Sequence, residues 1–341
     1  MKKARVISMI GPALLAISGV VYAQEQPLQV TVDNFVRAET DMYLALFARR
    51  GSLGKFVHLR ELPLEGTGVR PNRDTLYSEA VFDLDAGSVT ITLPDAGKRF
   101  MSMMVVDEDH YVREVAYGPG AHTYNRKQIG TRYLFVALRT LVDPSDLKDM
   151  DAAHALQDAT KVSQPGGPGK FETPNWNETS QKKVRAALIS LNDTLPDLRR
   201  AFGTRSDVDP IRHLIATASA WGGNPDEEAI YVNVTPAKND GNTIYNLNVP
   251  GSVPVNAFWS VIIYTADGHL QKNPYNAYSL NSVTAMKSAD GSVAIQFGGC
   301  DGKMPNCLPT MPGWNYMVRL YRPRAEILNG TWKFPEAQLA N

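Results

Sequence analysis

Apolar and polar residues alternate along several short stretches in the first half of the chain. Residues 88–93 read SVTITL, an alternation that is typical of a strand with one buried face. Apolar stretches at 99–106 and 131–138 predict two further strands, and Pro and Gly residues between them predict turns. Short strands joined by turns indicate an antiparallel sandwich. A helix is expected before them, at 31–51, where apolar residues recur at helical spacing.

The pattern changes near residue 143. A segment rich in Pro and Gly at 164–169 predicts an exposed loop, and a helix that starts at Ser180 carries apolar residues three or four positions apart. Strand patterns return at 244–249, 257–264, 292–297 and 315–321. The chain is therefore expected to be mainly β with a helical middle segment. We place an N-terminal β domain with its leading helix at 24–143, a helical connecting segment at 144–222 and a C-terminal β domain at 223–341.

The first 23 residues have the features of a secretory signal peptide. Three basic residues, Lys2, Lys3 and Arg5, precede an apolar stretch at 6–21, and cleavage is expected after Ala23. A membrane anchor is the alternative, but the apolar stretch is shorter than the ~20 residues that a span needs. No second long apolar stretch follows. We therefore expect a periplasmic or secreted protein without a stable membrane span once the signal is removed.

Size, charge and cysteine content narrow the class of protein. A chain of 341 residues predicts two domains, and 43% hydrophobic with 21% charged residues is typical of a folded protein. The 35 basic and 35 acidic residues balance, so nothing indicates a nucleic-acid partner. Cys300 and Cys307 are the only cysteines, and in an oxidising compartment we expect them to form a disulfide that closes a small loop. The sequence does not predict an oligomeric state.

Motifs for nucleotide-dependent or zinc-dependent chemistry are absent, so no cofactor is predicted. The first candidate site is the polar loop at 70–78. Asp74 is placed there as a base or as the group that orients one, Tyr77 as a donor, and Asn72 as a ligand contact. The alternative is that the side chains of Asn72 and Asp74 only stabilise turns.

The second candidate follows the strand at 99–106. His110 is the best-placed titratable base in the chain, and we predict that it transfers protons together with Asp74. A divalent metal held by neighbouring carboxylates is a weaker alternative, because Asp107 and Asp109 would not share a face with His110. A hydrogen-bonded His in a solvated turn is the other alternative.

Aromatic and amide side chains in the second half form the third candidate. Rings that stack and amides that bind hydroxyl groups are typical of sites for glycans and small polar molecules. Alternation along 315–321 places Asn315, Arg319 and Tyr321 on one face, where a buried Arg319 needs an anionic partner such as Asp74 or a ligand carboxylate. Packing between sheets is the alternative role for these rings. The remaining predicted ligand contacts are Trp221 and Trp259.

Several short motifs together resemble two families of unknown function that occur in tandem. The stretches at 72–78 and 109–111 resemble the N-terminal family numbered 1254, although Phe100 stands where that family has Tyr. The stretches at 258–260, 278–281, 312–315 and 319–321 resemble its usual partner, the family numbered 1214. The resemblance implies an immunoglobulin-like N-terminal sandwich and a jelly-roll-like C-terminal sandwich. It implies no reaction.

We therefore expect an exported two-domain enzyme with acid–base chemistry of the hydrolase or lyase type. Its substrate would be a small polar or glycan-like molecule in a cleft between the domains. A periplasmic protein that binds a carbohydrate or metabolite without catalysis, or a structural or interaction protein of the envelope, remain the alternatives.

Overall fold

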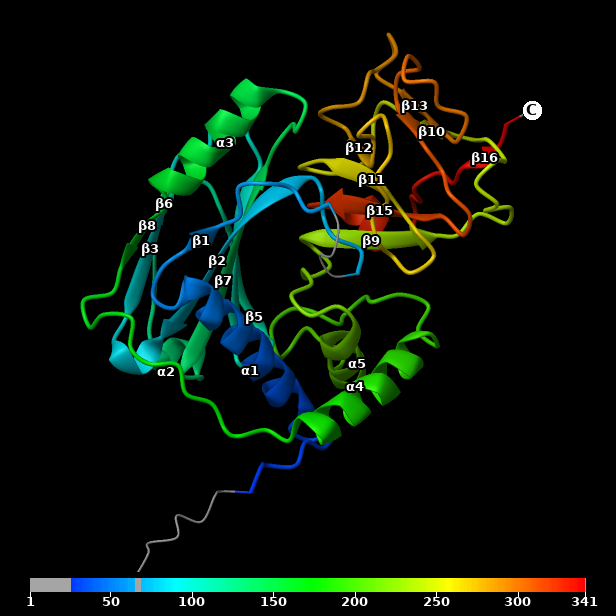
Figure 1. The fold of residues 1–341 in the computed structure, drawn as a ribbon. Helices are drawn as coiled ribbons and strands as arrows, with labels where there is room; N and C mark the ends of the chain where they lie inside the picture. Colours follow the sequence, from blue (N-terminus) through cyan, green and yellow to red (C-terminus); the bar gives the residue numbers. More distant parts are fainter. Residues whose placement is uncertain (1–25, 65–68, 341) are drawn as a thin grey trace, which may run out of the picture.

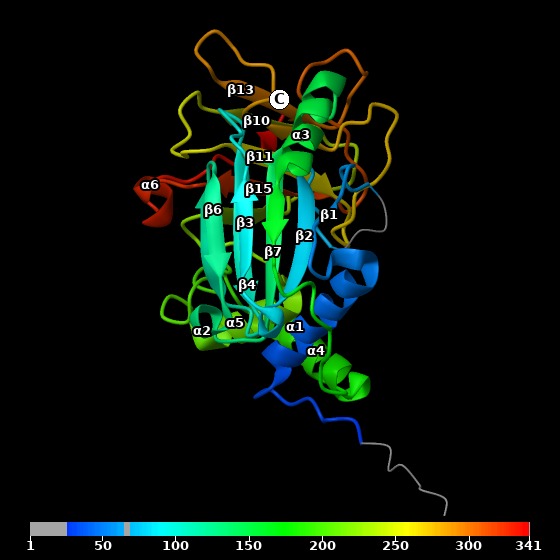
Figure 2. The same cartoon turned by 90° about the vertical axis from the view of Figure 1, so that its left-hand side faces the viewer.

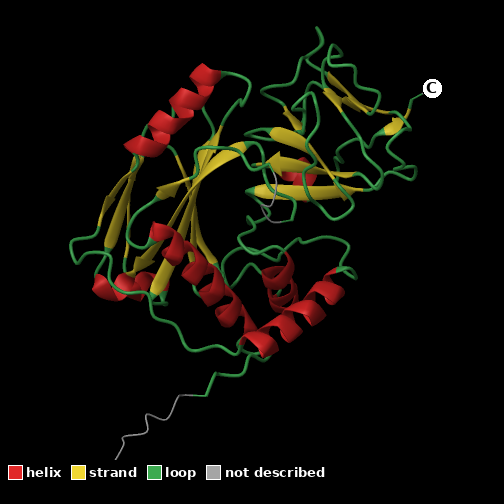
Figure 3. Ribbon diagram, in the orientation of Figure 1, coloured by secondary structure: helices red, strands yellow, loops and turns green. Residues whose placement is uncertain are grey.

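The computed structural model describes residues 26–64 and 69–340, so the predicted signal peptide lies outside the described residues. The chain is mainly β, with its longer helices in the leading and middle segments, which confirms the predicted class (Figure 3). The helices are α1 (Phe35–Phe47), α2 (Arg126–Ile129), α3 (Leu147–Ala159), α4 (Glu178–Asn192), α5 (Pro210–Ser219) and α6 (Ala325–Leu328). The N-terminal strands are β1 (Val57–His58), β2 (Thr75–Asp83), β3 (Val89–Leu93), β4 (Met101–Asp107), β5 (Val112–Tyr117), β6 (Gly120–Tyr124), β7 (Tyr133–Leu141) and β8 (Lys161–Ser163). The C-terminal strands are β9 (Ala229–Val234), β10 (Tyr245–Val249), β11 (Trp259–Tyr264), β12 (Ser279–Asn281), β13 (Val293–Phe297), β14 (Cys307–Leu308), β15 (Asn315–Tyr321) and β16 (Gln338–Leu339).

The N-terminal strands form two sheets. One has the order β1-β2-β7-β4-β5, and the other has the order β6-β3-β8. The alternation predicted at 88–93 is confirmed by β3, in which Val89, Ile91 and Leu93 are buried. These residues pack between the two sheets against Phe82 and Val136. Because β8 lies within 144–222 and pairs with β3, that segment is not wholly helical.

The other face of the five-stranded sheet is not exposed. Its lower part packs on α1, with Leu44 and Phe47 against Val81 and Phe135. Helices α4 and α5 then pack on α1 to complete a helical layer. Figure 2 shows these helices gathered at the lower end of the N-terminal strands. The upper part of the same sheet face lies against the C-terminal domain.

The C-terminal strands also form two sheets, with the orders β12-β11-β15-β9 and β14-β13-β10-β16. Their core contains the side chains of Trp259, Trp314, Tyr316 and Phe297. Figure 1 shows the sheet of β9, β15 and β11 beside β2 and β7 of the N-terminal domain. Two sheet pairs therefore agree with two sandwiches, whereas the immunoglobulin-like and jelly-roll-like labels stay predictions.

The Cys300–Cys307 disulfide is present, as predicted, and it lies in the C-terminal domain between β13 and β14. A disulfide is typical of proteins from oxidising compartments. Within the described part of the chain, each helix is too short or too polar to cross a membrane. The disulfide is compatible with export.

Candidate functional site

The N-terminal sheet presents one row of polar side chains toward the C-terminal domain. Tyr77 in β2 pairs with Arg139 in β7, Arg139 pairs with Ser102 in β4, and Ser102 pairs with Tyr117 in β5. These residues share a sheet face because directly paired positions on neighbouring strands point the same way. Arg139 is 5% exposed although it carries a charge. Its Nε donates to Tyr77 Oη at 3.3 Å.

The C-terminal sheet presents a second row of polar side chains, at positions that are paired with one another across neighbouring strands. Ser260 in β11 pairs with Asn281 in β12 and with Arg319 in β15, and Arg319 pairs with Tyr231 in β9. Ser260 is fully buried, and Arg319 is 4% exposed. The two rows face each other, since the charge of Arg139 acts on Tyr231 and that of Arg319 acts on Tyr77. Burial of both guanidinium groups requires compensating polar contacts.

The loop before β2 joins the two rows. The amide nitrogen of Asn72 lies 3.2 Å from Tyr77 Oη and 3.0 Å from Tyr321 Oη, and its Oδ1 accepts from the backbone N–H of Asp74 at 2.8 Å. The loop thereby brings polar groups from both domains together. We call this set the interdomain polar cluster; its members are Asn72, Asp74, Tyr77, Arg139, Ser260, Asn281, Arg319 and Tyr321.

The two tyrosines of the cluster have pKa values shifted in opposite directions. Burial alone would raise the pKa of Tyr77, but the charge of Arg139 and hydrogen bonds from Asn72 and Arg139 outweigh it and lower the pKa. Burial and the charge of Asp74 raise the pKa of Tyr321 well above its ordinary value. Groups whose environments separate their pKa values are suited to act as base and acid.

Asp74 lies beside Arg319 and Ser260, and the charge of Arg319 and the hydroxyl of Ser260 each act to lower the pKa of its carboxyl. Burial raises the pKa of the Asp74 carboxyl, and the charge of Arg319 opposes this shift only in part. Asn281 donates to Asp74 Oδ1 at 3.4 Å. Among the described residues, Asp74 Oδ2, Ser260 Oγ and Arg319 Nη1 have no hydrogen-bond partner. Unsatisfied buried groups are rare in native proteins, and a bound water or ligand is a common reason for them.

His110 does not contact Asp74. It adopts a left-handed backbone conformation, with φ of 62°, in a turn closed by the Asp107 carboxylate, which accepts from the N–H groups of Asp109 and Tyr111. Its Nε2 accepts from Gly222 N–H at 2.8 Å, so its Nδ1 carries the proton and lies 2.9 Å from Thr217 Oγ1.

Both ring nitrogens of His110 are thus occupied, and burial lowers its pKa well below 6.5. In this arrangement the ring has no free lone pair for a substrate, so we assign no proton transfer to it. It reaches the cluster through Gly222, whose carbonyl accepts from Arg139 Nη2 at 3.2 Å. His110 therefore holds Gly222 in place, and the carbonyl of Gly222 in turn accepts from Arg139.

The other predicted contact residues lie in three different places. Asn315 is at the edge of the cluster, where it accepts from Arg70 Nη1 at 2.7 Å. Trp221 stacks on His110, with ring centroids 5.2 Å apart, and belongs to the helical layer. Trp259 points away from the cluster, because it precedes Ser260 in β11 and packs in the C-terminal core against Phe334. A ligand-binding role for Trp259 is therefore not supported by its position.

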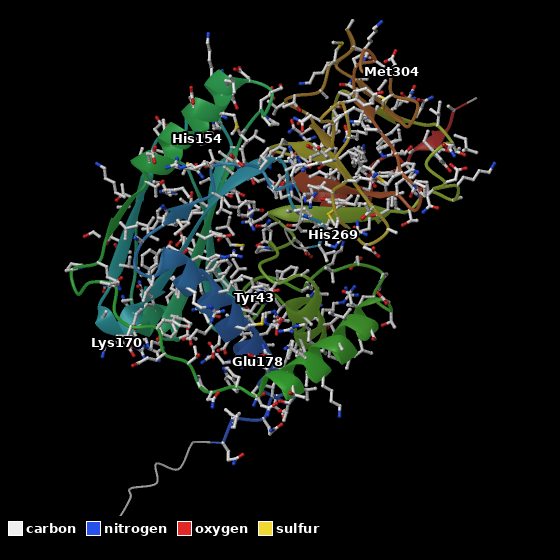
Figure 4. The ribbon with its side chains drawn as sticks, in the orientation of Figure 1. Tyr43, His154, Lys170, Glu178, His269 and Met304 are labelled. Carbon is white, nitrogen blue, oxygen red and sulfur yellow. A yellow bond between two sulfur atoms is a disulfide. The ribbon has the colours of Figure 1, made fainter. Side chains whose placement is uncertain are left out.

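Two other features of the surface do not form a comparable site. A hollow of about 440 Å³ on the outer C-terminal sheet is lined by Asn246, Asn248 and Met304 among others, and Figure 4 places Met304 on the side away from the N-terminal sheets. Across residues 26–64 and 69–340, no group of three His, Cys, Asp or Glu side chains is arranged to hold a metal ion. Of the carboxylates around His110, Asp107 closes the turn, Asp109 pairs with Arg37 and Glu108 accepts from Tyr133 N–H.

Sequence reasoning missed Arg139 and Tyr231 as members or neighbours of the site, whereas Arg70 lay in the predicted loop. Arg139 is the one charged residue in β7, which reads YLFVALRTL. A single arginine inside an apolar strand is a signal of a buried polar contact, and it was available before the structure. Tyr231 has no such signal, since a tyrosine in a strand is ordinary.

Comparisons with known proteins agree with this architecture. Residues 53–128 match a protein family of unknown function, DUF1254, and residues 228–325 match another, DUF1214. No curated protein matches the chain significantly.

Two solved structures are similar in fold. The VPA0106 protein from Vibrio parahaemolyticus has 18% identity and a TM-score of 0.71 over 92% of this chain and 100% of that chain. An uncharacterized protein from Burkholderia cenocepacia has 12% identity and a TM-score of 0.51 over 90% of this chain and 88% of that chain. The chain is thus a tandem protein of two families of unknown function, with the DUF1254 domain first and the DUF1214 domain second.

Proposed function

We propose that the protein is an enzyme that performs acid–base chemistry on a small polar molecule held at the interdomain polar cluster. The observation that carries this proposal is the pair of tyrosines, one from each domain, whose pKa values are shifted apart around the shared Asn72. Perturbed pKa values at such a junction are typical of functional sites. The proposal keeps the predicted hydrolase- or lyase-type chemistry but moves the base from His110 to Tyr77.

In the proposed reaction, Tyr77 is the base. Its phenolate, stabilised by Arg139, accepts a proton from a substrate C–H or from a water molecule. Tyr321, which keeps its proton, donates it to the oxygen of the leaving group. The first alternative gives an elimination, and the second gives a hydrolysis. In each reaction Tyr77 gains one proton and Tyr321 loses one, and no electrons are transferred, so the chemistry needs no redox cofactor.

We place the entry to the cluster on the side of the loop that carries Asn72. Asn72, Tyr77 and Tyr231 are half-buried, whereas Asp74, Ser260 and Tyr321 are at most 2% exposed. A small molecule would therefore meet Asn72 and Tyr77 first, with Tyr321 and Asp74 behind them. Active sites that exclude water strengthen the electrostatic interactions inside them.

The test is a turnover screen of the full chain against small hydroxylated and acidic metabolites and glycosides, followed by Tyr77→Phe. We expect Tyr77→Phe to lower kcat by at least about 100-fold, since general acid–base catalysis contributes that much or more. Tyr124→Phe is the matched control, because Tyr124 is a buried tyrosine that donates to Glu114 in the N-terminal domain. Equal activity of the Tyr77→Phe and wild-type proteins would reject the proposal.

Binding without catalysis is the second candidate function. It is favoured by His110, whose two nitrogens are both engaged in structural hydrogen bonds. A protein that binds a metabolite and turns over none, with unchanged affinity in Tyr77→Phe, would support this candidate.

A further inference from the structure

The unpartnered atoms of the interdomain polar cluster form a set with a defined chemistry. Arg319 Nη1 is a charged donor, Ser260 Oγ is a hydroxyl that donates or accepts, and Asp74 Oδ2 is an acceptor. Ser260 and Arg319 are paired positions on adjacent strands, and both act on the Asp74 carboxyl. The three groups therefore face the same small region between the sheets.

Positive charge exceeds negative charge in this region. Arg319 and Arg139 are buried, and among the described residues neither forms an ion pair with a carboxylate. Arg70 adds a third guanidinium, over the ring of Tyr264. The carboxylates nearby are Asp74 and Glu79, and the charges of Arg50 and Arg139 both act to lower the pKa of Glu79.

A guanidinium that stays charged in a buried site is stabilised by an anion. Arg319 already donates from Nη2 to the carbonyl of Arg70 at 2.9 Å, so the backbone holds one side of the group in place. The other side, Nη1, is left for a further acceptor. A carboxylate oxygen is the acceptor that forms the strongest hydrogen bond there.

We infer that the cluster binds a small hydroxycarboxylate, with its carboxylate on Arg319 Nη1 and Ser260 Oγ and its hydroxyl donating to Asp74 Oδ2. This inference rests on the proposed function, for which it names the substrate class. A ligand with both groups satisfies all three unpartnered atoms and places a negative charge on Arg319, whereas a neutral polyol brings no charge and a simple carboxylate has no donor for Asp74 Oδ2.

Binding is tested by thermal shift and calorimetry on the full chain with matched probes. D-Gluconate and lactate carry both groups, sorbitol and lactamide lack the charge, and propionate lacks the hydroxyl. We expect gluconate or lactate to raise Tm in proportion to the logarithm of its concentration. The counterpart that lacks one group should bind at least about tenfold more weakly.

Ser260→Ala separates a ligand contact from a structural role. Ser260 Oγ makes no hydrogen bond of ordinary geometry and only assists the Asp74 carboxylate, so its removal should change the Tm of the free protein little and should weaken binding of the hydroxycarboxylate several-fold. Ser52→Ala is the matched control, since Ser52 is also a buried serine without a partner but lies in the turn after α1. It should leave binding unchanged.

Three results would overturn the inference. They are the absence of any Tm shift with both gluconate and lactate at millimolar concentration, equal binding of sorbitol and gluconate, and a large loss of Tm in free Ser260→Ala. Arg319→Lys, which keeps the charge, should also weaken binding by about tenfold or more. These readouts do not depend on turnover, so failure here leaves the tyrosine chemistry standing, and normal binding with unaffected turnover in Tyr77→Phe rejects only that chemistry.

Discussion

Tyr77 and Tyr321 come from different domains and share one amide nitrogen, that of Asn72, at 3.2 and 3.0 Å. Arg139 lies on the Tyr77 side of this pair, and Asp74 acts on the Tyr321 side. The two phenols are chemically identical, so the difference in their pKa values comes entirely from the folded surroundings. The domain junction is therefore what gives them separate roles.

Tyr77 should ionise before Tyr321 as pH rises. Because Arg139 and Asn72 stabilise its phenolate, its pKa lies below 10.0, whereas that of Tyr321 lies well above. The ultraviolet difference spectrum of wild type minus Tyr77→Phe should show a tyrosinate band with a midpoint below 10.0. Wild type minus Tyr321→Phe should show no such band below pH 10, and a Tyr77 midpoint above the ordinary value would contradict the proposed base.

His110→Ala should destabilise the fold by about 3 kcal/mol, because it removes two buried hydrogen bonds and the ring that packs on Trp221. Chemical denaturation at pH 7.5 measures this free energy. His269→Ala, at an exposed position, should change it by less than about 0.5 kcal/mol. An equally small effect at His110 would mean that its hydrogen bonds contribute nothing.

The same histidine should make stability depend on pH in the acid range. Its folded-state pKa lies well below 6.5, so below about pH 6.5 the unfolded chain binds a proton that the folded chain does not. Stability should therefore rise with pH up to about 6.5, with a slope that approaches 1.4 kcal/mol per pH unit from this group. In His110→Ala that contribution to the slope should be absent, and a slope identical to that of wild type would contradict the assignment.

Asp107 should contribute with the opposite sign. Burial raises its pKa from 3.8 to about 6, so the folded state binds the extra proton between these values and loses this stabilisation as pH rises. Asp107→Asn keeps the oxygen that accepts from Asp109 and Tyr111 N–H but cannot ionise. The stability of Asp107→Asn relative to wild type should increase from pH 4 to pH 6, as measured by urea unfolding at each pH. A constant difference would show that Asp107 has an ordinary pKa.

Removal of the disulfide should lower stability without affecting the site. Cys300 and Cys307 are separated by seven positions, and a loop of this length predicts a loss of about 2 kcal/mol in Cys300→Ser/Cys307→Ser. The loop adjoins β13 and β14, in the sheet that does not contribute to the cluster. Binding of gluconate should therefore be unchanged, and a parallel loss of binding would show that the outer sheet supports the site.

The sequence predicted the parts of the site that follow from strand periodicity. Alternation along β15 placed Asn315, Arg319 and Tyr321 on one face, and this is confirmed by their contacts with the N-terminal loop. The expectation that Asp74 would lie near Arg319 is also met, since each acts on the pKa of the other. These relationships need only the period of a strand and the cost of burying a charge.

Positions that depend on tertiary packing could not be predicted from strand periodicity. His110 ends a strand, which favoured an exposed base, but a left-handed residue turns its ring inward against α5. Trp259 was selected as an aromatic contact, although the periodicity of β11 would have assigned it to the face opposite Ser260. Facing rows on two separate sheets cannot be derived from either sheet alone.

One residue, Gly222, connects these regions. Its N–H is held by His110 and its carbonyl by Arg139, so both of its polar groups are committed to residues more than eighty positions away in sequence. A displacement of the Gly222 backbone would strain both bonds and remove one of the contacts that hold the Arg139 guanidinium beside Tyr77. The segment between the two family domains therefore helps to hold the interdomain polar cluster. If the chain were cut or replaced in this segment, we expect the pKa values of Tyr77 and Tyr321 to move closer together even if both domains kept their fold.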